Sequence, residues 1–203
     1  MISITVGLIV MAGVLGIFVN TVKASSDAMK MTRLNQELRA AMDVMTRDIR
    51  RAGYWGKAST SIGFGPAVSN VNPFDVIAPG ATDGVANSCI IYSYDEDKDG
   101  VVDEHEYFGF RLKSSAVQSR EENENCTASE EWKDITDKQS ILITALKFEF
   151  TNPKTVAVNP GGASKIKVRE VTITLQGELK NDSSVKREIK DAVRVRSDQW
   201  TAS

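Results

Sequence analysis

The amino-acid sequence predicts an α+β protein in which a long N-terminal α-helix packs on an antiparallel β-sheet domain. Two observations favour this fold class. Residues 1–52 keep apolar side chains at helical spacing, and the C-terminal half contains short segments in which apolar and polar residues alternate. The 203 residues, 41% of them hydrophobic, suffice to bury one sizeable core. This excludes a chain that is disordered throughout and a small scaffold held together by disulfides.

The helix is expected to begin with an apolar segment. Residues 1–22 contain no charged side chain, and a helix of that length crosses the roughly 30 Å hydrocarbon core of a bilayer. A cleaved secretory signal is not indicated, because the basic start and the small-residue exit motif are missing. A buried core helix is the alternative. We therefore expect residues 1–26 to form a transmembrane half of the helix.

The same helix is expected to continue as an amphipathic half over residues 27–52. Its apolar side chains recur every three or four residues and form one stripe, made of Met31, Leu34, Leu38, Ala41, Met42, Met45, Ile49 and Ala52. Gly53 is a plausible stop. The pattern predicts one helix from near Met1 to about Ala52, whose stripe covers a sheet.

The rest of the globular domain, which spans residues 27–203, divides into a loop and a sheet. Residues 53–88 are rich in Gly, Pro, Ser and Asn and are expected to form the loop between helix and sheet. Strand patterns follow within 89–203, at 89–94, 107–112, 141–151, 166–175 and 185–195. In the third of these, Leu142, Leu146, Phe148 and Phe150 are expected on one face. We expect one antiparallel sheet with one face covered.

Cys89 and Cys126 are the only cysteines. An even pair in a domain outside a membrane favours a disulfide formed in an oxidising compartment. Two buried thiols are the alternative, and no Cys-x-x-Cys spacing indicates a metal or redox site.

An acidic segment over residues 95–106 carries the one chemical motif. It matches the calcium-loop pattern D-x-[DN]-x-[DN]-G-x5-E at every defined position. Calcium prefers six to eight oxygen ligands. The pattern assigns them to the side chains of Asp95, Asp97, Asp99, Asp103 and Glu106 and to the Val101 carbonyl. Because the flanking segments are typical of strands, we expect a calcium site at a β-hairpin, and an acidic turn without metal is the alternative.

No enzymatic activity is expected. His105 is the only histidine and lies inside the acidic loop, and the sequence contains no phosphate-binding loop or HExxH motif. Binding of nucleic acid is also not expected. The formal net charge is -2, and the basic run over 186–196 is interrupted by Glu188 and Asp191.

The apolar start MISITVGLIVMAGVLGIF and the helix end TRDIRRAGYWG resemble those of the PilW-type minor pilins of type IV pili. The J-type minor pseudopilin of type II secretion is a more distant likeness. An aspartate-rich hairpin turn and the C-terminal VRVRSDQW also fit the resemblance. Its most specific part is the helix end, with Arg47, Asp48, Arg50, Arg51, Ala52, Gly53, Tyr54 and Gly56.

The resemblance implies a pilin-like structural subunit that takes part in pilus initiation or tip assembly. Residues 1–26 would lie in the inner membrane before assembly and in the filament core afterwards, with the domain in the periplasm and then at the cell surface. The implied partners are other minor pilins, the major pilin and a PilY-type tip protein. The family's prepilin leader, cleavage-site glycine and early glutamate do not appear, so Met1 is expected to lie a few residues inside the mature helix.

Two alternatives to the minor pilin remain open at the level of sequence. One is a type II secretion minor pseudopilin. The other is a membrane-anchored adhesion module that depends on calcium and works alone. A membrane-bound enzyme is the weakest reading, because no catalytic constellation supports it.

Overall fold

The computed structural model describes residues 2–61, 72–151, 154–157 and 164–202. Two helices lead the chain, α1 (Ile2–Ile49) and α2 (Ala58–Ser61). The strands and one short 3-10 helix, η1, follow in the order β1 (Ile77–Thr82), β2 (Val85–Ser93), η1 (Glu104–Glu106), β3 (Tyr107–Lys113), β4 (Ala116–Arg120), β5 (Trp132–Asp134), β6 (Ile141–Phe150), β7 (Lys154–Ala157), β8 (Ser164–Val168), β9 (Glu170–Leu179), β10 (Asp182–Arg194) and β11 (Gln199–Ala202). The α+β class is as the sequence predicts.

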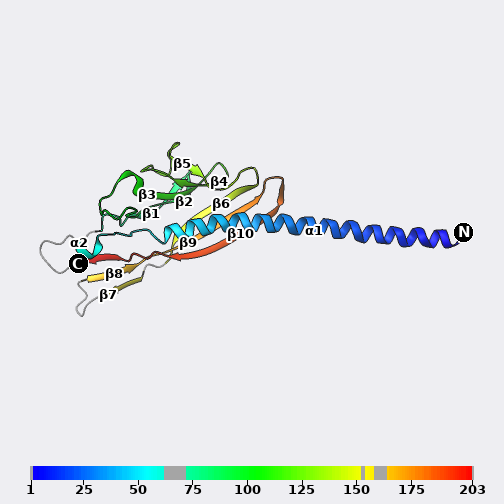
Figure 1. Ribbon diagram of the computed structural model, residues 1–203, viewed down its shortest axis with the longest axis horizontal. Helices are drawn as coiled ribbons and strands as arrows, with labels where there is room; N and C mark the ends of the chain where they lie inside the picture. Colours follow the sequence, from blue (N-terminus) through cyan, green and yellow to red (C-terminus); the bar gives the residue numbers. More distant parts are fainter. Residues whose placement is uncertain (1, 62–71, 152–153, 158–163, 203) are drawn as a thin grey trace.

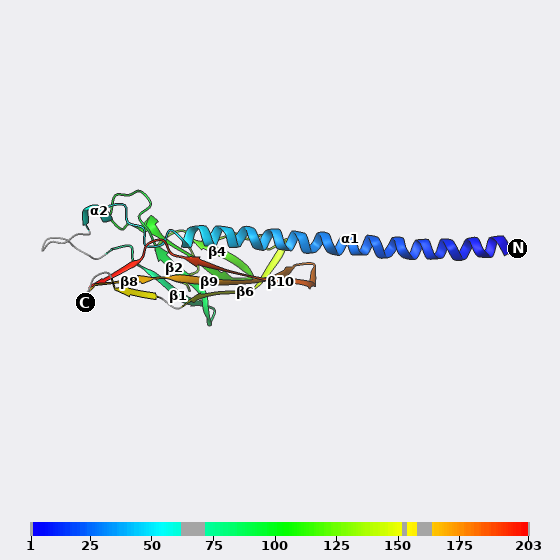
Figure 2. The ribbon, with the colours of Figure 1, turned by 90° about the horizontal axis from the view of Figure 1, so that it is seen from below.

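Helix α1 is far longer than the domain that it supports. Its 48 residues span about 72 Å, and its N-terminal half extends beyond the sheets, so that the two chain termini lie at opposite ends of the molecule (Figure 1). The second view shows the same projection (Figure 2). The helix ends close to the predicted point. Gly53 follows it with a φ of 74°, and the Gly53 N–H donates to the Ser93 carbonyl at 2.8 Å.

The transmembrane half of the helix expected over residues 1–26 is not found among the described residues. Within the residues that could be searched, no helix combines the length and the apolarity that crossing a bilayer requires.

The strands form three antiparallel sheets, where the sequence predicts one. The first has the order β1-β2-β3-β4-β5, the second β10-β9-β6 and the third β11-β8-β7. The segment 166–175, expected as one strand, is divided between two sheets at Arg169. That side chain is 4% exposed and forms a 2.5 Å ion pair with Asp75, which holds the chain at the point where it passes from β8 to β9.

The helical stripe covers the sheets as predicted. Helix α1 packs on β9 and β10, and β2 of the first sheet faces β6 of the second. Most of the predicted stripe is buried, namely Leu34, Leu38, Ala41, Met42, Met45, Ile49 and Ala52, whereas Met31 is only partly buried. They meet Val171, Ile173 and Leu175 of β9 in one continuous core. Burial of this stripe fixes the amphipathic half of α1 to the domain.

Strand β6 differs from the expected pattern. Leu142 was expected to share a face with Leu146 and Phe148, but it is only partly buried, whereas Ile141 and Ile143 are buried. A register shift between Ile143 and Ala145 inserts one residue into β6 where it pairs with β9. Because strand side chains alternate, one extra residue moves the preceding side chains to the opposite face.

The loop expected over 53–88 is shorter in the structure. Strand β1 and the first residues of β2 lie within it, joined by a turn in which Asp83 and Gly84 have φ values of 51° and 78°. Strand β1 contains Pro79, which its place at the edge of the sheet allows. Residues 62–71 of the expected loop lie outside the described residues.

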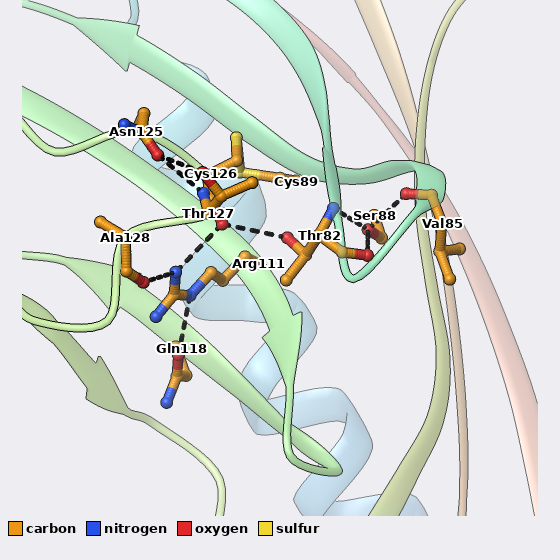
Figure 3. The surroundings of a disulfide bond; sticks show 10 residues. All are labelled: Thr82, Val85, Ser88, Cys89, Arg111, Gln118, Asn125, Cys126, Thr127 and Ala128. Carbon is orange, nitrogen blue, oxygen red and sulfur yellow. Dashed lines mark hydrogen bonds between the residues drawn. A yellow bond between two sulfur atoms is a disulfide. The ribbon is translucent and has the colours of Figure 1, made fainter.

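The predicted disulfide is confirmed. Cys89 in β2 bonds to Cys126 across a separation of 37 residues, with the Cα atoms 6.0 Å apart. Figure 3 shows the adjacent Arg111 side chain, which is 1% exposed and donates to the carbonyls of Cys126 and Ala128 at 3.0 and 2.6 Å. The disulfide and this guanidinium together hold the segment after β4 on the first sheet.

Candidate metal centre in the acidic loop and the exposed face of the helix

The acidic loop connects β2 to β3, so its two flanks are strands, as the sequence predicts. The loop occupies residues 94–106 and ends in η1. The pairing of Ser93 with Tyr107 brings its two ends together. A β-hairpin therefore holds the residues that the calcium pattern selects.

Three of the predicted ligands come together. Asp95, Asp97 and Asp99 each offer a carboxylate oxygen within 4.8 Å of the others, and Asp95 is buried while the other two are exposed. This is the one such group of acidic, histidine or cysteine side chains in the described part of the chain. Asp103 and Glu106 lie outside it.

Backbone amides hold each of these three carboxylates in place. The Asp99 N–H donates to Asp97 Oδ1 at 2.9 Å, and the Val101 N–H donates to Asp99 Oδ1 at 2.7 Å. Asp95 Oδ2 accepts from the N–H of Gly100 at 3.1 Å. Gly100 has a φ of 75°, a conformation that glycine adopts at little cost, and this lets the loop turn sharply behind the carboxylates.

Glu106 has a structural role that the pattern did not reveal. Its side chain is 2% exposed, and its two oxygens accept from the backbone N–H groups of Glu96 at 2.8 Å and Asp103 at 3.1 Å. With Asp103 at the N-cap, Glu106 completes a capping box on η1. Burial raises the pKa of the Glu106 carboxyl, and the two amide donors act in the opposite direction. Glu106 therefore closes the loop.

The loop is attached to the segment that leaves α1. The Asp95 N–H donates to the Tyr54 carbonyl at 2.9 Å, and the Gly56 N–H donates to Asp95 Oδ2 at 2.8 Å. A Cβ atom on Gly56 would lie 2.8 Å from the Cβ of Lys98, so only glycine allows this approach. In the sequence, Gly56 belongs to the family resemblance and to the glycine-rich segment 53–88. The need for glycine at this position could not be predicted, because a contact between distant segments leaves no local pattern.

The exposed half of α1 is the second candidate functional feature. Large apolar side chains project from it into solvent, each more than half exposed: Val6, Met11, Val14, Leu15, Ile17, Phe18, Val19 and Val22. They belong to the part of the helix that extends beyond the domain (Figure 1). A soluble monomer rarely exposes so continuous an apolar surface.

A long helix, apolar and uncovered at one end and packed on antiparallel sheets at the other, is consistent with a pilin-like α+β protein. A family model supports the same class: prepilin peptidase-dependent protein B matches residues 27–195. The chain belongs to this family, which is related to the pilins and pseudopilins. The matched region includes the amphipathic half of α1, the acidic loop and both cysteines. No curated protein and no solved structure matches the chain.

Family membership indicates a role related to a pilus or pseudopilus. It also indicates association with components of such a filament and with the membrane or the pilus.

Proposed function

We propose that the chain is a minor pilin of the PilW type, a structural subunit that takes part in initiating a type IV pilus or in forming its tip. The observation that carries this proposal is the exposed apolar half of α1. In water such a surface is unfavourable, but neighbouring apolar helices or lipid can cover it at little cost. A helix of this kind can pass from the membrane into a bundle of helices.

The division of α1 into two halves supports the proposal. The apolar stripe of the amphipathic half is buried in the domain core, so we expect the domain to stay folded whatever covers the other half. Gly7, Gly13 and Gly16 have open space around them, with no described atom within 4 Å of a Cβ built at each position. Small residues on an uncovered helix allow close approach of another helix.

The implied partners are the major pilin, other minor pilins and a PilY-type tip protein. The inner membrane would hold the subunit before assembly, with the domain in the periplasm. A type II secretion minor pseudopilin would use the same helix in the same way, so it is the second candidate. The role is structural, without catalysis.

A crosslinking experiment tests the proposal. A photoreactive amino acid is placed at Leu15 of the full chain in cells, and at Glu130, an exposed residue of the domain, as a control. We expect Leu15 to crosslink to pilin or pseudopilin subunits in assembled filaments and Glu130 to do so much less. Crosslinks to lipid alone, with none to a filament subunit, would contradict the proposal.

Deletion of the gene distinguishes the two kinds of filament. A minor pilin predicts fewer surface filaments with normal protein secretion, and restoration of the filaments by the intact chain. A secretion defect with normal surface filaments would instead identify a pseudopilin.

A further inference from the structure

Asp95 is buried and incompletely satisfied. Its side chain is 1% exposed, and Asp95 Oδ2 accepts from the backbone N–H groups of Gly56 and Gly100. Asp95 Oδ1 is also buried, yet it has no hydrogen-bond partner in the described part of the chain. A buried carboxylate oxygen left in this state costs free energy, which a bound cation would recover.

Two further carboxylates lie close to Asp95. Asp97 and Asp99 each offer a carboxylate oxygen within 4.8 Å of one of Asp95, and both are exposed. We propose that Asp95, Asp97 and Asp99 bind one calcium ion. The ion would enter the site from the side of the exposed Asp97 and Asp99 and would contact the buried Asp95 at the bottom of the site.

The chemistry of the donors favours calcium over other ions. All three side chains offer carboxylate oxygens, which are the ligands of calcium and magnesium, and no cysteine or histidine joins the group. Calcium accepts an irregular shell of six to eight oxygens, so the Val101 carbonyl and water molecules can complete it. Magnesium requires a strict octahedral shell and gives up its water reluctantly, so it should bind more weakly here.

The structure also assigns roles within the loop. Asp103 and Glu106 already hold η1 and the two ends of the loop together, so we assign them a structural role and not a role as calcium ligands. The ion would have its effect through Asp95, which hydrogen-bonds to Tyr54 and Gly56 after α1. Calcium would therefore stabilise the junction between the hairpin and the end of the helix.

The experiment measures calcium binding to the full chain in detergent, by calorimetric titration and by thermal melts in EDTA, in millimolar Mg2+ and in millimolar Ca2+. The test variant is Asp97→Asn with Asp99→Asn, whose amide oxygens can still accept from the Asp99 and Val101 N–H groups. The matched control is Glu130→Gln with Glu131→Gln. It removes the same charge from exposed positions outside the loop.

We expect one calcium ion per chain and a melting temperature that rises with calcium and much less with magnesium. The control should bind like the wild type, and the test variant should bind at least about tenfold more weakly while melting normally in EDTA. No heat and no melting shift for the wild type in millimolar calcium would overturn the proposal. Equal binding by the test variant, or equal loss in the control, would overturn it as well. None of these outcomes depends on filament assembly.

Discussion

Asp48 shows how a single residue joins the helix to the sheet. It lies in the last turn of α1, where the helix dipole disfavours an acidic side chain. Two tyrosines of the hairpin compensate. The hydroxyl of Tyr92 donates to Asp48 Oδ2 at 2.5 Å, and that of Tyr94 donates to Asp48 Oδ1 at 3.1 Å. The Arg51 guanidinium lies 4.1 Å from the centre of the Tyr94 ring. Burial, and next the charge of Asp48, raise the pKa of both tyrosines, so the hydroxyls remain donors.

Replacing Asp48 with Ala should therefore destabilise the domain. It leaves the hydroxyl of the buried Tyr92 without an acceptor, and such a loss costs about 1–3 kcal/mol of unfolding free energy. The measurement is urea unfolding of the full chain. Asp43→Ala is the control, because Asp43 lies on the exposed face of the same helix and should change the free energy by less than about 0.5 kcal/mol. Equal effects of the two substitutions would show that the tyrosine contacts contribute nothing.

At the residue scale, the sequence could predict which residues form the acidic loop, but not which contacts each of them makes. The spacing of Asp95, Asp97 and Asp99 sufficed to bring their carboxylates together, because the turn at Gly100 is local. Glu106 matched the same pattern, yet in the structure it accepts from the N–H groups of Glu96 and Asp103. The contact with Asp103 is a local capping box, whereas the contact with Glu96 arises from the pairing of β2 with β3, which a linear pattern does not encode.

At the scale of elements, one ion pair links α1 to the hairpin of β9 and β10. Lys30 Nζ lies 2.8 Å from Asp182 Oδ2 and is both a hydrogen-bond donor and an ionic partner. The hydrogen bond to Asp182 raises the pKa of Lys30 above its ordinary value of 10.5, and the hydrogen bond from Lys30 lowers the pKa of Asp182 below 3.8. The folded state therefore favours the charged form of both groups.

This pair predicts a dependence of stability on pH. The lowered pKa of Asp182 contributes stability that is present above pH 3.8 and is lost as the pH falls through the folded value. The raised pKa of Lys30 contributes stability that is present below pH 10.5 and is lost as the pH rises through the folded value. Melts of wild type and Asp182→Asn should differ at neutral pH and converge at both extremes. Because the pair is partly exposed, added salt should also reduce the difference. A difference that is constant from acid to alkaline pH would contradict this account.

The disulfide acts between β2 and the segment after β4. It closes a loop that contains the acidic hairpin, β3 and β4. In the chain-entropy model a loop of this size contributes about 4 kcal/mol, so Cys89→Ala with Cys126→Ala should lower the free energy of unfolding by roughly that amount. The check is urea unfolding with and without a reductant. Wild type unfolded under reducing conditions should approach the variant, and a variant as stable as the oxidised wild type would be inconsistent with the prediction.

Some helices and strands could be predicted from the sequence and others could not. The apolar stripe of α1 could be predicted, because burial of one side of a helix imposes a regular spacing on its apolar residues. Strand β1 was missed because Pro79 and Gly80 suggest a loop, although a Cβ on Gly80 would lie 2.5 Å from Cys126 Sγ and the position needs glycine. Strand β4 was missed for another reason. Its turn from β3 uses Ser114 and Ser115 at positive φ, where the usual glycine signal is absent.

At the scale of the whole molecule, one half of α1 stabilises the fold and the other half is available for assembly. The core lies between the amphipathic half of α1 and the sheets, while the other half of α1 leaves the domain without a described contact to it (Figure 2). Substitutions in the exposed half should therefore leave the domain fold intact. The same substitutions should change whatever the helix meets outside the chain.

Val14→Asp tests this separation. The side chain is 60% exposed, so a charge there is tolerated by the isolated chain in water. In a bilayer or an apolar helix bundle the same charge costs about 2.5–3.5 kcal/mol, and we expect fewer filaments in cells that carry the variant. Val14→Leu keeps the surface apolar and should assemble normally. Thermal melts of the domain should be alike for both variants and the wild type, because Val14 is no part of the core. Normal filament numbers with Val14→Asp would mean that this half of α1 does not enter an apolar environment, and the proposed role in assembly would fail with it.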